Sequence, residues 1–237
     1  MTDRQYSTGR QPIDPALRRF LDETTAPIPS VQPSTADRVR LGRHFMQKAL
    51  DDRGGIRGLP NGVAVRDVTI SGDMKGRLYL PPRTDEPLPV LVYAHGGGWV
   101  VGSIATHDPF CRLLSEAGNV IILSVEYRLA PEHPFPAALD DALACYRALL
   151  ESGVRPEQLI VMGDSAGGGL ALALALRLKE QGLAPPIGLI LLSPWVDLSR
   201  LGGGGYPRPR AGIAATSAVH ARPGTRPVPY HPSWRWI

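Results

Sequence analysis

Short apolar runs alternate with longer helical patterns through the middle of this chain of 237 residues. Four runs lack regular apolar–polar alternation, and they span 90–94, 120–127, 159–162 and 187–192. Between them, apolar residues recur at helical spacing and predict helices over 108–116, 137–151 and 166–181. Because unalternating runs are typical of strands buried on both faces, the pattern predicts an α/β fold with a mostly parallel central sheet.

The first 58 residues have a different pattern and predict a small helical segment. We expect one helix over about 14–23 and a second from about 34 to 50. From residue 62 onward, alternating apolar positions, a Ser71-Gly72-Asp73 turn and the segment 76–80 predict a β-hairpin. We therefore divide the chain into a helical segment over 1–58, an α/β core over 59–199 and a tail over 200–237.

The tail differs from the rest of the chain in composition. Glycine, proline and arginine make up 18 of its 38 residues, and no apolar periodicity continues past Leu201. Six of these residues are arginines and none is Lys, Asp or Glu, so the net charge of +4 becomes −2 when only 1–199 is counted. We expect the tail to be disordered, and the slightly acidic body argues against a nucleic-acid-binding protein.

The number of cysteines and the lengths of the apolar runs further narrow the class of protein. No apolar run approaches the roughly 18 residues that cross a bilayer, and the first residues carry no apolar signal segment. Cys111 and Cys145 are too few for a disulfide framework, so we expect two buried thiols. The sequence therefore predicts a cytoplasmic protein without a membrane span.

The strongest chemical signal is Gly163-Asp-Ser165-Ala-Gly167-Gly, placed between an apolar strand and an apolar helix. Glycines two positions before and after the serine remove side chains that would clash in a tight turn. Such a turn presents the Ser165 hydroxyl above the sheet, and we interpret Ser165 as a nucleophile. The alternatives are a plain glycine-rich turn or a phosphate loop, although no lysine follows before Lys179.

A second glycine-rich segment, His95-Gly-Gly-Gly-Trp99, follows an earlier strand. Acyl transfer builds negative charge on a carbonyl oxygen, and preorganised backbone N–H groups stabilise that charge. We expect the amides of Gly96, Gly97 and Ala166 to form this oxyanion hole. A glycine triplet alone is more often a flexible turn, so the interpretation depends on its pairing with the serine turn.

A third segment, over 127–141, reads YRLAPEHPFPAALDD and predicts a proline-stiffened connection into a helix. We interpret His133 within it as structural, because it lies between prolines and precedes Ser165. With 95–99, 163–168 and 191–199, this segment completes four motifs in the order found in bacterial carboxylesterases and acetyl-hydrolases. Over about 62–199 the chain resembles the hormone-sensitive-lipase-like family of α/β-hydrolases, and the first 58 residues look like that family's helical cap.

The resemblance implies hydrolysis of small-molecule esters with short or medium acyl chains, through an acyl-enzyme on Ser165. It implies no metal and no cofactor. Within the motifs, the residues implied to support the site are His95, Gly98, Gly163, Asp164 and Gly167.

The resemblance stops before the acid and the base of a catalytic triad. In α/β-hydrolases these residues follow the serine along the chain, first Asp or Glu and then His. Asp197 follows Ser165, and His220 and His231 are the later histidines, but none lies in a segment that matches the family's acid or histidine motif. We leave acid and base unassigned, with these three residues as candidates.

The abrupt change after Ser199 leads to a hypothesis about the tail. Arg, Pro, Gly and Ala have GC-rich codons, so their surplus is what an out-of-frame reading of GC-rich DNA would give. The chain would then be truncated relative to the family, with the last strands of the sheet missing and the run 187–192 left as an apolar edge that promotes aggregation. Whether such a chain is active is left open, because no triad acid or histidine is assigned. A pseudoenzyme that binds acyl or lipid ligands, and a basic tail that binds acidic partners, remain alternatives.

Overall fold

Residues 34–52, 59–83 and 88–197 are described by the structure, a computed structural model. Their strands form one sheet in the order β1-β2-β4-β3-β5-β6. The strands are β1 (Ala64–Ser71), β2 (Met74–Leu80), β3 (Val90–Ala94), β4 (Ile121–Val125), β5 (Leu159–Asp164) and β6 (Gly188–Leu192). The β1–β2 hairpin and the β2–β4 pair are antiparallel, whereas β4, β3, β5 and β6 run parallel. The predicted mostly parallel α/β sheet is therefore confirmed.

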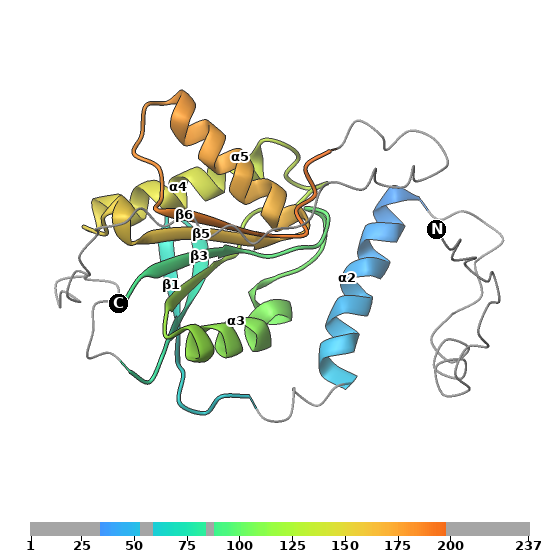
Figure 1. The fold of residues 1–237 in the computed structure, drawn as a ribbon. Helices are drawn as coiled ribbons and strands as arrows, with labels where there is room; N and C mark the ends of the chain where they lie inside the picture. The colour runs from blue at the N-terminus through green and yellow to red at the C-terminus, as the bar shows by residue number, and fades with distance from the viewer. Residues whose placement is uncertain (1–33, 53–58, 84–87, 198–237) are drawn as a thin grey trace, which may run out of the picture.

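Helices cover both faces of this sheet (Figure 1). On one face α4 (Ala137–Glu151) and α5 (Ala166–Glu180) enclose a core with alternate strand residues such as Val92 and Val161. On the other face α3 (Ile104–Gly118) covers the intervening residues, Tyr93 and Met162 among them. This two-sided burial explains why the strand sequences are apolar without alternation. One cysteine lies in each layer, and both are buried and free, as predicted.

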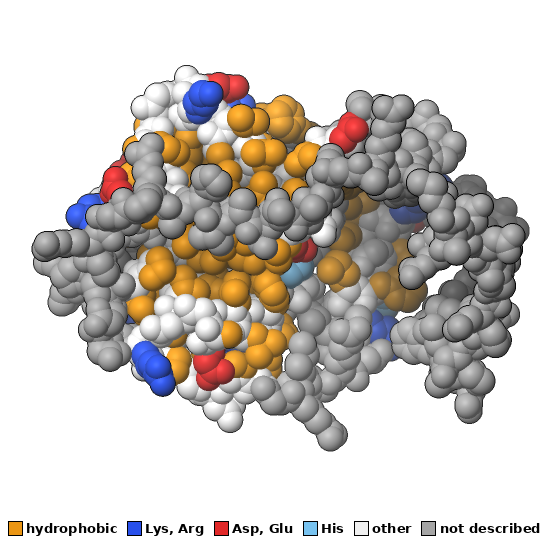
Figure 2. Space-filling model, viewed as in Figure 1, with side chains coloured by type: hydrophobic (Ala, Val, Ile, Leu, Met, Phe, Trp, Pro, Cys, Tyr) orange, Lys and Arg blue, Asp and Glu red, His pale blue; other side chains and the backbone are white. Residues whose placement is uncertain are grey.

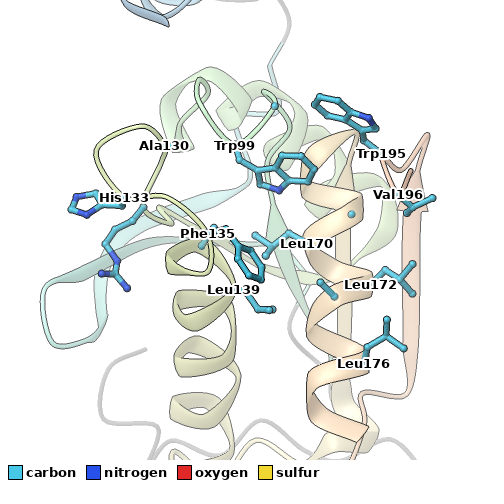
Figure 3. Close-up of a pocket in the computed structure, with 15 residues that line it drawn as sticks. Trp99, Ala130, His133, Phe135, Leu139, Leu170, Leu172, Leu176, Trp195 and Val196 are labelled. Carbon is cyan, nitrogen blue, oxygen red and sulfur yellow. The ribbon is translucent and has the colours of Figure 1, made fainter. Parts of the chain in front are cut away.

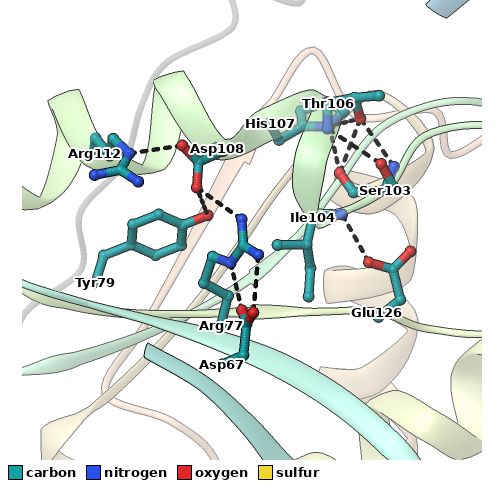
Figure 4. Close-up of polar contacts among 10 residues, drawn as sticks. All are labelled: Asp67, Arg77, Tyr79, Ser103, Ile104, Thr106, His107, Asp108, Arg112 and Glu126. Carbon is teal, nitrogen blue, oxygen red and sulfur yellow. Dashed lines mark hydrogen bonds and ion pairs between the residues drawn. The ribbon is translucent and has the colours of Figure 1, made fainter. Parts of the chain in front are cut away.

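Polar contacts fix α3 against the sheet (Figure 4). Asp108 of α3 accepts hydrogen bonds from Arg77 (3.1 Å) and Tyr79 (3.0 Å) of β2. The helix begins at Ile104, earlier than the expected 108, because Ser103 and Thr106 form a reciprocal capping box. The strand expected over 120–127 is shorter, and β4 spans Ile121–Val125.

The helix α2 (Thr35–Asp52) matches the predicted second helix and stands beside the sheet (Figure 1). Arg43 ties it to the loops after β3 and β4, donating to the carbonyl oxygens of Val100 (2.7 Å) and Ala130 (3.0 Å). The guanidinium also pairs with the carboxylate of Glu132 at 2.8 Å. Its assignment to a cap stays a prediction, and the helix expected over 14–23 lies outside the described residues.

The sheet ends at β6 within the described part of the chain, where β6 pairs only with β5. This agrees with the expectation of an apolar edge at 187–192. The tail over 200–237, with its predicted disorder and out-of-frame origin, lies outside the described residues. In the described ranges, no helix combines the length and the apolar character that a membrane span needs.

Candidate active site

Ser165 occupies the sharp turn between β5 and α5. Its backbone has φ 51° and ψ −117°, a positive-φ conformation that a residue other than glycine rarely adopts. The amide of Ser165 donates to the Leu192 carbonyl oxygen, and the carbonyl of Ser165 accepts from the Trp195 amide, both at 2.8 Å. The segment after β6 therefore holds the turn in place, and Ser165 itself is exposed.

Two glycines permit the close approach of β3, β5 and α5 at this turn. A Cβ atom on Gly163 would overlap the backbone of Gly167. One on Gly167 would overlap the carbonyl oxygen of Ala94, at the end of β3. The spacing of glycines around the serine is thus required by backbone contacts, as the motif predicts.

The loop after β3 turns through residues with positive φ. The φ angles are 125° at Gly97, 63° at Gly98 and 60° at Trp99. The amide of Gly96 donates to Oδ1 of Asp164 at 2.8 Å. The expectation that Gly96 is an oxyanion donor is therefore wrong, because its N–H is already engaged. Among the described residues, no hydrogen bond uses the amides of Gly97 and Gly98.

Asp164 joins the serine turn to this loop. Besides the Gly96 amide, Oδ1 accepts the hydroxyl of Tyr93 at 2.6 Å, and Nε2 of His107 lies 4.0 Å away. Burial, followed by the hydrogen bond to Asp164, raises the pKa of Tyr93, so the phenol stays protonated and donates. The carboxylate thus holds the Gly96 amide and fixes the loop beside the serine turn.

His95 supports the same junction from within the core. Its ring is fully buried and stacks on Tyr127, with ring centroids 4.3 Å apart. Nδ1 lies 2.8 Å from the carbonyl oxygen of Gly96, which can only accept, so Nδ1 carries the proton. Burial lowers the pKa of His95 to about 4, and the ring is neutral near pH 7. This histidine stabilises the loop and is not placed as a base.

The remaining candidates for acid and base lie on separate segments of the chain. Asp197 is exposed beyond β6, and Glu180, the other carboxylate that follows the serine in the described chain, lies at the opposite end of α5. His133 is exposed, and its amide donates to the Leu129 carbonyl oxygen at 2.9 Å. His220 and His231 lie outside the described residues.

An apolar groove between α4 and α5 was not predicted from the sequence (Figure 3). Its volume is about 470 Å³. We define the α4–α5 groove by its lining residues, of which the main ones are Gly98, Trp99, Phe135, Leu139, Gly169, Leu170, Leu172, Ala173, Leu176, Trp195 and Val196. The tryptophans at 99 and 195 within two motifs are the sequence signal that could have indicated it.

Metal-ligating side chains do not cluster in the part of the chain that the structure describes. No group of three or more His, Cys, Asp or Glu residues is placed there to hold an ion.

Comparison with known proteins gives a consistent set of relatives. A family described as alpha/beta hydrolase fold matches residues 91–218, which extends past Ser199. Carboxylesterase NlhH of Mycobacterium tuberculosis is 37% identical over 201 residues, covering 81% of this chain and 61% of the relative. Ethyl acetate hydrolase of Pseudomonas putida is 45% identical over 130 residues, or 52% of this chain and 41% of the relative.

Solved structures agree in fold. The esterase EstE5, in a crystal soaked with p-nitrophenyl butyrate, has a TM-score of 0.64 and 36% identity, covering 77% of this chain and 57% of its own. An esterase from the bacterial hormone-sensitive lipase family has a TM-score of 0.62 and 30% identity, covering 79% of this chain and 60% of its own. The chain thus spans less than two thirds of the length of these relatives.

Proposed function

Because this chain belongs to the α/β-hydrolase family, among the hormone-sensitive-lipase-like carboxylesterases and acetyl-hydrolases, we propose that it hydrolyses carboxylic esters with Ser165 as nucleophile. The observation that carries the proposal is the position of Ser165, exposed on a strained turn at the amino end of α5. Strained backbone of this kind concentrates at functional sites.

The oxyanion donors in this proposal are the amides of Ala166, Gly97 and Gly98. Ala166 is the first residue of α5, so its N–H has no carbonyl partner one turn earlier in the helix. The amides of Gly97 and Gly98 belong to the loop that Asp164 fixes beside the turn. The partial positive charge at the amino end of α5 adds to the stabilisation of a developing oxyanion.

The reaction follows from these positions. The Ser165 oxygen attacks the ester carbonyl carbon, the alcohol leaves, and water then releases the acid from the acyl-enzyme. The proton of the hydroxyl needs a base, and His220 and His231 are the candidates along the chain. Asp197 is the candidate acid, and no residue is assigned to either role.

The substrate class is supported by what the relatives are named for. They are a carboxylesterase, an ethyl acetate hydrolase and an acetyl-hydrolase of Streptomyces hygroscopicus. Two of these names specify an acetyl group or an acetate ester, and we propose short or medium acyl esters for this chain.

The test is hydrolysis of p-nitrophenyl acetate and butyrate by the full chain and by Ser165→Ala. We expect Ser165→Ala to lower turnover by on the order of 10⁶-fold, as for other serine hydrolases. Ser71→Ala, an exposed serine of β1, is the matched control and should keep full activity. Equal hydrolysis by Ser165→Ala, or no hydrolysis by the unaltered chain, would contradict the proposal.

The same assay identifies the base. His220→Gln and His231→Gln are compared one at a time with the parent chain. A triad histidine should cost as much turnover as the serine, because the two act as a unit. Full activity in both variants would exclude the two histidines.

A further inference from the structure

A group of aromatic rings joins α3 to the loop that follows β3. The ring of His95 stacks with that of Tyr127, with centroids 4.3 Å apart, and with that of His107, with centroids 5.3 Å apart. The Tyr93 ring lies 6.0 Å from the ring of His107. His107 belongs to α3, so it brings a helix residue to the junction that supports the serine turn.

The first turn of α3 fixes the position of His107 (Figure 4). The amide of Ile104 donates to Oε2 of Glu126, just after β4, at 2.9 Å. Within the turn, the reciprocal bonds of Ser103 and Thr106 complete the cap. The side chain of His107 is 16% exposed, so its surroundings restrict its movement.

One ring nitrogen of His107 faces Asp164. The hydroxyl oxygen of Thr106 lies 2.8 Å from Nδ1 and can donate to it, which leaves the ring proton on Nε2. Nε2 lies 4.0 Å from Oδ1 of Asp164. This distance is too long for a hydrogen bond, so the contact is an electrostatic attraction between an N–H group and a carboxylate. It becomes stronger when the ring is protonated.

Other cationic side chains do not compete for this carboxylate. In the described ranges, no Lys or Arg side chain forms an ion pair with Asp164. In the space-filling view, Lys and Arg side chains lie toward the margins of the face shown, whereas a histidine and an acidic side chain are visible near its centre (Figure 2). His107 is therefore the basic side chain that faces Asp164 in this part of the chain.

We propose that His107 is a positioning residue for the reaction. Its Nε2–H group attracts the Asp164 carboxylate and keeps it turned toward the Gly96 amide, so that the loop with the proposed oxyanion donors stays beside Ser165. The inference rests on the proposed function, because the position of this loop affects turnover only if the loop stabilises the oxyanion. In this role His107 acts through Asp164 and not on the ester itself.

Two substitutions separate the N–H group of His107 from its ring. His107→Phe keeps an aromatic ring against His95 but has no N–H, whereas His107→Gln keeps an N–H donor and lacks the ring. We expect His107→Phe to lower kcat about tenfold for acetate and butyrate esters, with little change in KM, because a small displacement of the donors slows the reaction. His107→Gln should recover most of this loss. If glutamine does not restore the rate that phenylalanine loses, the inference is overturned.

A double-mutant cycle tests whether His107 acts through Asp164. In an Asp164→Ala chain, His107→Phe should cause no further loss of kcat, because the carboxylate that it positions is gone. A further tenfold loss in this background would show that the two residues act independently, and would overturn the inference.

Hydrogen exchange gives a readout that does not need hydrolysis. In His107→Phe, the amides of the loop over 95–101 should exchange about fivefold faster than in the parent, and in His107→Gln they should not. The amides of β5 are the internal reference for a general loss of stability, and His44→Phe, at an exposed position on α2, is the matched control. Unchanged loop exchange in His107→Phe would overturn the inference. This exchange pattern in a chain that hydrolyses no ester would contradict the proposed function alone.

Discussion

The two sides of the serine turn differ in chemistry. On one side, the junction of Tyr93, His95, Gly96 and Asp164 is polar, and its hydrogen bonds are made to other groups of the protein. On the other side, the α4–α5 groove is apolar and leaves large side chains exposed. The hydrogen bonds of the junction position the loop, with Nε2 of His95 buried and without a partner among the described residues. The groove instead presents exposed apolar side chains, which are suited to take a ligand.

This difference makes separable predictions for the two sides. Changes in the junction should alter the rate for every ester by a similar factor. Changes in the groove should alter the preference among esters of different chain length. A substitution in the junction that changed the preference among chain lengths, or one in the groove that slowed all esters alike, would contradict this comparison.

Gly167→Ala should have the largest effect, because the added Cβ overlaps the Ala94 carbonyl oxygen across the junction. We expect the free energy of unfolding to fall by about 3 kcal/mol and hydrolysis to be lost. Urea denaturation measures the first effect. Gly188→Ala is the matched control, because nothing lies within 4 Å of its added Cβ. Equal stability of the two variants would contradict the close approach of β3 and α5.

Asp164→Ala should lower kcat by about 10²-fold, because the Gly96 amide loses its acceptor and the loop that carries the proposed donors Gly97 and Gly98 is no longer fixed. KM should change little, and all chain lengths should be affected alike. Asp164→Asn keeps an acceptor oxygen for Gly96 and Tyr93, and it should recover part of the loss. Steady-state kinetics with acetate and octanoate esters measure these effects, and a loss confined to octanoate would contradict a positioning role.

Titration of His95 should make stability depend on pH. Burial depresses its folded-state pKa to about 4, below the unfolded value of about 6.5. As pH falls from about 6.5 to 4, the unfolded state gains a proton that the folded state excludes, so about 3 kcal/mol of stability is lost. Above about pH 6.5 both states are neutral and this contribution is constant.

The measurement is urea unfolding of the parent and His95→Gln at about pH 7, 5.5 and 4. The difference in free energy between the two should diminish as the pH falls. His44→Gln, at an exposed position on α2, is the control and should follow the parent. A constant difference between parent and His95→Gln would show that His95 titrates alike in both states.

Arg43→Ala should have the smallest effect, because it removes only the contacts between α2 and two loops near the site. We expect about 1 kcal/mol of lost protection in α2, visible as faster hydrogen exchange. Glu132→Gln keeps the two carbonyl contacts of Arg43 and should have a smaller effect. The Arg43 side chain holds the pKa of Glu132 down to about 2, so the pair is ionised near neutral pH. Unchanged exchange in Arg43→Ala would mean that α2 is held by other contacts.

The sheet and the serine turn could be predicted because their signals are local. Continuous apolar runs require strands buried on both faces, and glycines around Ser165 require a tight turn. The bond from Gly96 to Asp164 joins residues far apart in sequence, so the glycine motif alone does not show that the Gly96 amide is engaged. The direction of an amide depends on such long-range contacts.

The groove could not be predicted either, because it too depends on contacts between residues far apart in sequence. Its residues come from four separate segments, and its volume depends on the spacing of α4 and α5 and on the orientation of Trp99. Leucines such as Leu172 and Leu176 on α5 have the pattern of core residues, and only the assembled fold shows that they line open space. The start of α3 was placed too late because its capping residues have the composition of a loop.

The central claim is that Ser165 is a nucleophile beside a formed oxyanion hole. Its most direct test is reaction of the full chain with a fluorophosphonate, followed by mass spectrometry of the peptides. The account predicts a phosphonyl adduct on Ser165, absent from Ser165→Ala and formed more slowly in Asp164→Ala. An adduct on another residue, or none on the parent chain, would contradict it.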